Sequence, residues 1–135
     1  MRTKDLAPFQ EVVAPYAHEL EGFDPQTWIE DDRNIAVSDG EGNYNLFEYE
    51  MEGVYTGHTF YTKRGRAALD LGKEVLDYVF SLPEVRVIRG LTPLHKTGAR
   101  WFSRKLGFQS YGVVRTVAGP CELFILDKPT FLGRK

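Results

Sequence analysis

A basic segment that contains a glycine is the first part of the sequence that could do chemistry. Thr62-Lys-Arg-Gly-Arg-Ala-Ala68 follows a run rich in β-branched and aromatic residues and precedes an amphipathic run. A turn between a strand and a helix presents backbone N–H groups that bind anions. Lys63, Arg64 and Arg66 add positive charge for a phosphate or pyrophosphate. The alternative interpretation is a solvated turn that binds nothing.

Lys96 to Phe108 is the second segment of interest, and it predicts a short amphipathic helix followed by a strand. Phe102 and Leu106 lie at the spacing of one buried helix face. Thr97 is the expected N-cap, and Gly107 stands where a left-handed C-cap would sit. Taken alone, this segment is a structural element.

Changes in hydrophobic period predict the elements that position these two segments. Apolar residues at helical spacing indicate helices, and β-branched or aromatic runs between glycine-containing turns indicate strands. The expected helices cover residues 8–21 with a kink at Pro15, a short stretch from Asp24-Pro25, 66–80, and a stretch from Thr97, and the expected strands cover 34–37, 44–50, 54–62, 85–91, 108–116 and 121–127. Residues 129–135 are expected to form a polar C-terminal tail.

This order of elements predicts an α+β domain in which helices cover a mixed, mostly antiparallel sheet. The helix over 66–80 connects the strands 54–62 and 85–91, so these two strands should be parallel neighbours. The strand 85–91 has too few polar residues for an exposed edge and is expected at the centre of the sheet. Because no linker or repeat divides the chain, residues 1–135 are expected to form a single domain.

Composition and charge exclude several classes of protein. With 135 residues, of which 42% are hydrophobic and 27% charged, the chain fits a globular protein rather than a collagen-like, coiled-coil or disordered one. Residues 1–60 hold 3 Lys or Arg and 13 Asp or Glu, whereas residues 61–135 hold 14 and 6. The second half therefore carries charge for an anionic partner. Nucleic acid is not the expected partner, because the net charge is −2.

Other features bear on location and on metals. The one cysteine, Cys121, cannot form an internal disulfide and is expected to be a small buried residue. No apolar run reaches the roughly 18 residues of a membrane helix. The first residues lack the apolar core of a signal peptide, so a cytoplasmic location is expected. The spacing of histidine, cysteine and carboxylate residues fits no metal site.

Taken together, the two segments resemble the GCN5-related N-acetyltransferase (GNAT) superfamily. Its usual patterns are Arg/Gln-x-x-Gly-x-Gly/Ala after the fourth strand and Asn-x-x-Ala…Tyr-x-Lys-x-Gly-Phe near the end, and the resemblance covers about residues 34–126. It implies a GNAT fold, in which backbone amides of the first motif hold the pyrophosphate of acetyl-CoA. It also implies that the strands ending at Thr62 and Leu91 diverge and admit the pantetheine arm between them.

The resemblance implies a set of site residues. The cofactor-binding residues would be Phe60, Tyr61, Thr62, Lys63, Arg64, Gly65, Arg66, Ala67, Ala68 and Lys96, with acetyl-CoA as the cofactor and no metal. Lys96 replaces the asparagine of the second motif. When the first motif is aligned through Arg64, Ala67 stands at a glycine position, and when it is aligned through Gly65, Thr62 stands where Arg or Gln belongs. Ser103 takes the place of the tyrosine that often protonates the CoA thiolate.

His58 is the best candidate for a catalytic base, with Ser103 as the second catalytic candidate. The alternative for His58 is a packed histidine, because it shares a strand face with Val54, Thr56 and Phe60. Nearby on the predicted meander, Glu48, Glu50 and Glu52 could attract a cationic amine or form a solvated strand face.

Two functions of different class follow. The first is an N-acetyltransferase that transfers an acetyl group from acetyl-CoA to the amine of a small molecule or protein. The second follows from the variant Arg64-Gly-Arg-Ala-Ala68 and the strand end Leu91-Thr-Pro93, which look like acetyltransferase-like proteins of tailed bacteriophages. It is a non-catalytic protein of the same fold that acts in virion assembly or genome ejection by contacting virion proteins, in the host cytoplasm or in the virion.

Overall fold

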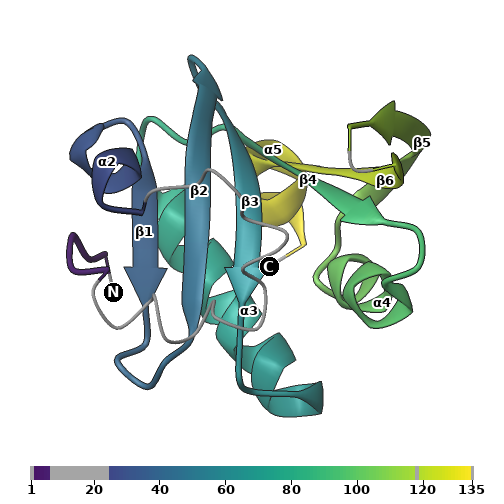
Figure 1. The fold of residues 1–135 in the computed structure, drawn as a ribbon, viewed down its shortest axis with the longest axis horizontal. Helices are drawn as coiled ribbons and strands as arrows, with labels where there is room; N and C mark the ends of the chain where they lie inside the picture. Colours follow the sequence, from purple (N-terminus) through teal and green to yellow (C-terminus); the bar gives the residue numbers. More distant parts are fainter. Residues whose placement is uncertain (1, 7–24, 118, 135) are drawn as a thin grey trace.

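A computed structural model describes residues 2–6, 25–117 and 119–134. Six strands form one sheet in the order β1-β2-β3-β4-β6-β5 (Figure 1). The strands are β1 (Ile35–Ser38), β2 (Tyr44–Met51), β3 (Val54–Phe60), β4 (Val87–Pro93), β5 (Gln109–Thr116) and β6 (Gly119–Asp127). The helices are α2 (Pro25–Glu30), α3 (Gly65–Ser81), α4 (Thr97–Lys105) and α5 (Lys128–Gly133). The α+β class and the mostly antiparallel sheet are confirmed.

β3 and β4 form the one parallel pair among the described strands, and α3 connects them. Their register runs from Val54 opposite Val87 to Thr56 opposite Arg89 and then stops, although the strands continue to Phe60 and Pro93. The predicted divergence of these strands is therefore confirmed. β4 also pairs along its whole length with β6, so it lies inside the sheet as expected.

The main hydrophobic core lies between the sheet and α3, which crosses behind the strands in Figure 1. Leu71, Val75 and Val79 of α3 are buried there, as the helical spacing predicts. Gly72 lies where α3 meets α4, and a Cβ atom at this position would be 3.0 Å from the Leu106 side chain. The close contact between the two helices therefore depends on a glycine.

The opposite face of the sheet carries a second, smaller core. Ile29 of α2 packs there with Leu6, Ala36, Leu46 and Phe60. A bridge between Arg2 and Val37 joins the start of the chain to β1. The expected helix over residues 8–21 and its neighbour Asp24 lie outside the described residues. None of the described helices is long and apolar enough to cross a bilayer.

Two expectations are wrong, one about the C-terminal residues and one about the start of α4. Within the expected polar tail, the described residues 129–134 are mostly helical, because α5 ends at Gly133 and the Phe131 ring stacks on Phe80 with centroids 4.9 Å apart. Asp127 caps α5 by accepting a hydrogen bond from the Thr130 amide at 2.7 Å.

The N-cap of α4 is Lys96 rather than Thr97, and it makes no side-chain capping bond. Gly107 has φ +100°, as a left-handed C-cap requires.

The role of α5 leads to a first prediction. Phe131→Ala should lower the free energy of unfolding by about 1–3 kcal/mol, because the half-buried Phe131 ring and its apolar burial are lost and the buried Phe80 ring loses its stacking partner. Leu132→Ala is the matched control, since Leu132 is 50% exposed and should change stability by no more than about 0.5 kcal/mol. Urea unfolding of both variants measures this. Equal stabilities for the two variants would mean that α5 adds nothing to the core.

Candidate functional site

The divergence of β3 and β4 opens a cavity of about 750 Å³, here called the splay cavity. Beyond Thr56 and Arg89 the described strands no longer pair with each other, so backbone groups on the facing edges have no sheet partner across the gap. The lining includes His58 from one face of β3 and Thr59 from the other. The cavity therefore passes through the sheet.

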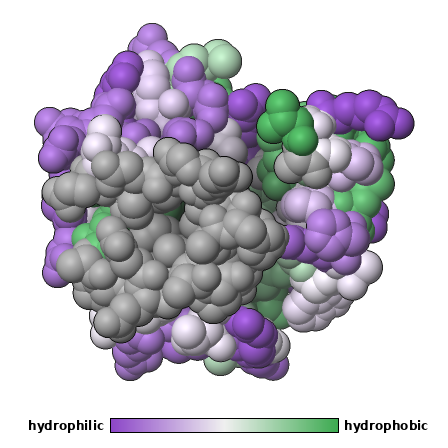
Figure 2. Space-filling model, viewed as in Figure 1, coloured by the Kyte–Doolittle hydropathy of each residue, from purple (hydrophilic) through white to green (hydrophobic). Residues whose placement is uncertain are grey.

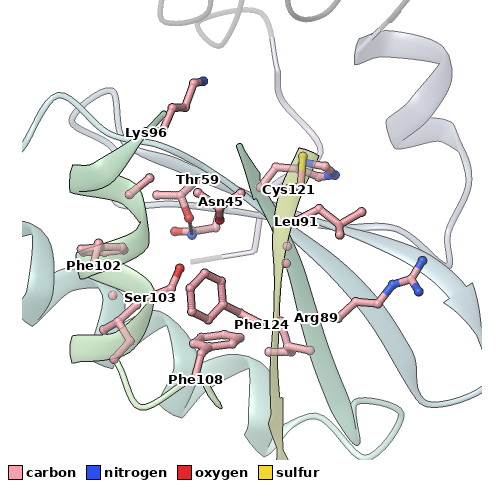
Figure 3. A pocket seen from close by; sticks show the side chains of 18 of the residues that line it. Asn45, Thr59, Arg89, Leu91, Lys96, Phe102, Ser103, Phe108, Cys121 and Phe124 are labelled. Carbon is pink, nitrogen blue, oxygen red and sulfur yellow. Dashed lines mark hydrogen bonds between the residues drawn. The ribbon is translucent and has the colours of Figure 1, made fainter. Parts of the chain in front are cut away.

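Figure 3 shows that the splay cavity has an aromatic part and a polar part. The rings of Phe102, Phe108 and Phe124 gather around one part, beside the hydroxyl of Ser103. Lys96 and Cys121 lie at the other end, with Asn45 and Thr59 between them. Cys121 is buried, as expected, and it also lines the cavity. An elongated ligand with a polar and an apolar end would match this division.

The ionisable side chains on the cavity wall are basic or neutral. His58, Arg89, His95 and Lys96 line it, and within the described part of the chain no Asp or Glu does. Arg89 forms an ion pair with Glu50 at 3.4 Å and donates from Nε to Thr56 Oγ1 at 2.9 Å. Thr56 in turn donates to Glu50 at 2.8 Å. Glu50 therefore belongs to a network that ties β2, β3 and β4 together where the divergence begins.

His58 lies in β3 opposite Leu46 and faces away from α3. Its side chain is exposed to solvent, and because it lines the cavity it is partly desolvated. This desolvation lowers the pKa of His58 below its usual value of 6.5, while the carboxylates of Glu48 and Glu50 act in the opposite direction. His58 is therefore neutral at pH 7 and can accept a proton.

Asn43 holds the turn that follows β3. This side chain is 2% exposed, and its Oδ1 accepts hydrogen bonds from the amides of Thr62 at 2.8 Å and Lys63 at 3.1 Å. The Thr62 hydroxyl donates to the same atom at 3.2 Å, and Asn43 Nδ2 donates to Asp39 at 2.9 Å. Two amides of the predicted anion-binding turn are thus already bound within the protein.

The basic residues of this turn have different tasks. Lys63 forms ion pairs with Asp39 and Glu41, each at 3.3 Å, and these contacts raise the pKa of Lys63. Arg64 donates to the carbonyl of Tyr61 at 2.6 Å. Arg66 is exposed at the start of α3. Of the three predicted phosphate ligands, Arg66 is the one that extends into solvent without a contact that holds it to the turn.

The start of α3 presents open backbone donors. Gly65 has φ +58°, a left-handed conformation that glycine adopts without strain. In the described chain, no side chain caps this helix, and the first turn of any α-helix leaves its amides without intrahelical partners. The amides that remain for an anion are those of the residues after Lys63.

α4 forms one wall of the splay cavity and is held largely by charge. None of its described residues is fully buried. Glu122 of β6 is 4% exposed and accepts hydrogen bonds from Arg100 Nε at 2.8 Å, from Arg104 and from Ser110 at 2.6 Å. Ser110, followed by the two arginines, lowers the pKa of Glu122. The carboxylate therefore stays charged and fixes α4 against β5 and β6.

The structure brings together part of the predicted site. His58, Phe60, Lys96 and Ser103 line the splay cavity. The turn from Tyr61 to Ala68 lies outside its lining, at the end of β3. Tyr61 points into the core, where its hydroxyl donates to Asn45 Oδ1 at 2.5 Å, and burial raises the pKa of this hydroxyl. The side chain of Ala68 is also buried in the core.

Several residues of the site escape sequence reasoning. Among them are Asn43, Thr59, Arg89, His95 and Phe124. Asn43 belongs to the Asp39–Asn43 turn, which indicates a hairpin but not a contact with Thr62. The sequence gives no signal for this contact, because the burial of Asn43 depends on how distant segments pack. Within the described residues, no cluster of His, Cys, Asp or Glu could hold a metal ion.

Solved structures of acetyltransferases resemble this chain. The aminoglycoside acetyltransferase AAC(6')-Ib in complex with coenzyme A and kanamycin is 19% identical, has a TM-score of 0.73, and the match covers 98% of this chain and 96% of that one. A spermidine N-acetyltransferase SpeG chimera from Vibrio cholerae and hSSAT is 14% identical with a TM-score of 0.64, covering 85% and 78%. An acetyltransferase of the GNAT family from Bacillus anthracis is 15% identical with a TM-score of 0.59, covering 78% and 74%.

These similarities establish the fold. No protein-family model and no curated protein sequence matches the chain. At 14–19% identity, the solved structures show that the chain has the fold of GNAT-family acetyltransferases.

The contacts of Asn43 lead to a second prediction. Asn43→Ala should lower the free energy of unfolding by about 1–3 kcal/mol, because buried donors of the turn lose their acceptor. Gln109→Ala, which removes an exposed amide at the start of β5, is the control and should change stability by no more than about 0.5 kcal/mol. Thermal and urea unfolding measure both variants. Wild-type stability in Asn43→Ala would show that the turn does not depend on this side chain.

Proposed function

We propose that the protein is a GNAT-superfamily N-acetyltransferase that transfers the acetyl group of acetyl-CoA to an amine. The observation that carries this proposal is the splay cavity, which opens where β3 and β4 separate and lies beside the uncapped start of α3. The structures of AAC(6')-Ib that share this fold contain coenzyme A. A thioester cofactor fits both features of this chain, an anion site and an elongated slot.

The residues of this chain fit the cofactor in two places. The open amides after Lys63 and the side chain of Arg66 would hold the pyrophosphate at the start of α3. The unpaired edges of β3 and β4 would bind the amide groups of the pantetheine arm, as an added strand binds to a sheet. Phe60 and Lys96 line the cavity along this path. The remaining residues of the turn, from Tyr61 to Ala68, shape the anion site through their backbone.

Two side chains of the cavity have catalytic roles in this proposal. Bound acetyl-CoA supplies an activated thioester. Neutral His58 accepts a proton from the attacking amine, so that a C–N bond forms as the C–S bond breaks. Ser103 points its hydroxyl into the cavity (Figure 3), but serine is a far weaker acid than tyrosine. Because a thiol has a pKa of about 8.5, the thiolate of coenzyme A can leave and take its proton from water.

The acceptor is an amine of a small molecule or of a protein. The similar acetyltransferases are named for aminoglycosides and spermidine. In this chain, Glu50 is bound to Arg89 and Thr56 and is not available to attract a cationic amine. We place the protein in the cytoplasm of a bacterium, where acetyl-CoA is present.

The second candidate function is a non-catalytic phage protein of this fold that acts in virion assembly or genome ejection. One observation favours it: Asn43 and the Asp39–Glu41 carboxylates already occupy two amides and one lysine of the turn that would bind the cofactor. In that case the protein would bind other virion proteins through its surface. Failure to bind coenzyme A would favour this candidate.

The third prediction tests cofactor binding. Acetyl-CoA at 100 times its dissociation constant should stabilise the folded protein by about 2.7 kcal/mol and raise its melting temperature. Arg66→Ala should weaken binding at low salt by about tenfold, because a charge-assisted bond to phosphate is lost.

The control for this experiment is Lys73→Ala, which removes an equal charge from an exposed position in the middle of α3. It should leave the affinity within about twofold, because exposed charges far from the ligand are screened. Calorimetry gives both affinities. If acetyl-CoA neither binds nor stabilises the wild-type protein, the proposed function is wrong.

The fourth prediction concerns pH. Because the pKa of His58 lies below 6.5, the rate of thiol release should be constant near pH 7 and fall as the pH drops through that lower value. His58→Ala should lose this acid limb and most of the activity. Ser103→Ala should lose little, since water can protonate the thiolate. An unchanged pH profile in His58→Ala would assign the base to another group.

A further inference from the structure

The splay cavity contains more apolar wall than an acetyl group can contact. On the side of α3 and α4, six large apolar side chains surround one compartment, which we call the acyl chamber: Phe47, Leu76, Phe102, Leu106, Phe108 and Phe124. Phe47, Leu76 and Phe124 are at most 4% exposed, so this end is continuous with the core. Figure 3 shows the rings of Phe108 and Phe124 next to each other, with the Phe102 ring apart from them at α4.

Two glycines open the way into this chamber. Thr56 and Arg89 are the last residues that pair between β3 and β4, so the first positions of the gap are Gly57 and Gly90. Both lie on the side of the sheet that faces α3, because a Cβ atom at Gly57 would touch Phe47 and Ile88 at 3.4 Å, and Gly90 is two residues after buried Ile88. At these two first positions of the gap, β3 and β4 therefore contribute no side chain of their own.

The splay cavity has open space directly beside Gly90. A Cβ atom built there would have no neighbour within 4 Å, although Gly90 is on an inner strand and lines the cavity. Its φ lies outside the left-handed region, so its backbone conformation does not require glycine. A residue with a side chain would fit the strand, but it would project into the chamber.

The expected path of the cofactor ends at these glycines. If the pyrophosphate binds at the start of α3, which follows the open end of β3, the pantetheine arm runs back along the gap toward Thr56 and Arg89. Its thioester then lies at the convergence, next to Gly57 and Gly90. An acyl chain longer than acetyl would extend from that point into the apolar compartment.

We propose that the acyl chamber is a subsite for the acyl group of the donor, and that the protein prefers an unbranched aliphatic acyl-CoA of four to six carbons over acetyl-CoA. This rests on the proposed function, because it needs coenzyme A at the same site. As in acetyl transfer, the bond between the acyl carbon and sulfur breaks and a bond between the acyl carbon and the amine nitrogen forms. The products are the thiol of coenzyme A and one amide. Each methylene that enters the chamber should raise the affinity about fourfold.

Calorimetric titration of the full chain with coenzyme A, acetyl-CoA, butyryl-CoA and hexanoyl-CoA tests the proposal. The expected result is an affinity that rises from acetyl-CoA to hexanoyl-CoA by at least about tenfold. Gly90→Val should remove this increase, so that acetyl-CoA and hexanoyl-CoA bind to the variant with affinities that agree within about threefold. Gly98→Val is the matched control, because a Cβ atom there also has no neighbour within 4 Å but Gly98 does not line the cavity. It should keep the full dependence on chain length.

The outcomes separate this proposal from the proposed function. If coenzyme A and acetyl-CoA bind but affinity does not increase with chain length, the chamber is not an acyl subsite and the acetyltransferase proposal stands. If none of the four compounds binds, the proposed function itself is wrong. If the affinity rises equally with acyl-chain length in the wild type and in Gly90→Val, the acyl chain lies elsewhere and the proposal is overturned. Should Gly90→Val fail to fold, as its melting temperature will show, Gly90→Ala replaces it and should reduce the increase in part.

Discussion

The parallel pairing of β3 and β4 and its early end determine most of what this structure can do. Three residues on each strand pair, and the Glu50–Arg89–Thr56 network lies across the last pair. A parallel ladder that ends inside a sheet leaves strong donors and acceptors without partners. Such an arrangement is stable only if side chains brace the point of separation and a ligand or water satisfies the open edges. The ion pair and the hydroxyl brace it here, and the splay cavity provides the room for a ligand.

A second constraint acts at the other end of β3. Asn43 joins the β1–β2 hairpin to the turn before α3 by accepting two amides and a hydroxyl, and Lys63 strengthens the same junction through Asp39 and Glu41. The turn is therefore pre-organised before any ligand arrives, which lowers the entropy lost on binding. The same contacts limit which amides can serve an anion. The turn before α3 is thus rigid, but it leaves fewer backbone amides free for an anion than a turn without these contacts would.

The order of elements could be predicted because hydrophobic period and turn residues are local signals. Strand boundaries from β1 to β6 lie within a few residues of expectation, and the parallel pair follows from the crossover helix. The C-terminal helix was missed because Lys128-Pro-Thr-Phe-Leu is too short to show a helical period, although Asp127 followed two residues later by Pro129 is a capping signal. Asn43 and the pair of Gly57 and Gly90 could not be predicted, since both depend on strand register and on contacts between distant residues.

The attachment of α4 has a consequence for motion. α3 is anchored by fully buried side chains such as Leu71, Val75 and Val79. Among the described residues α4 has no fully buried side chain: partly buried Phe102 packs against the main core, and Arg100 and Arg104 bind the carboxylate of Glu122. Segments with little buried apolar surface open locally at lower free energy than the core. α4 is therefore expected to open at a lower free energy than α3 and the sheet. Because α4 forms one wall of the splay cavity, such an opening would admit a bulky ligand from the side without threading it between β3 and β4.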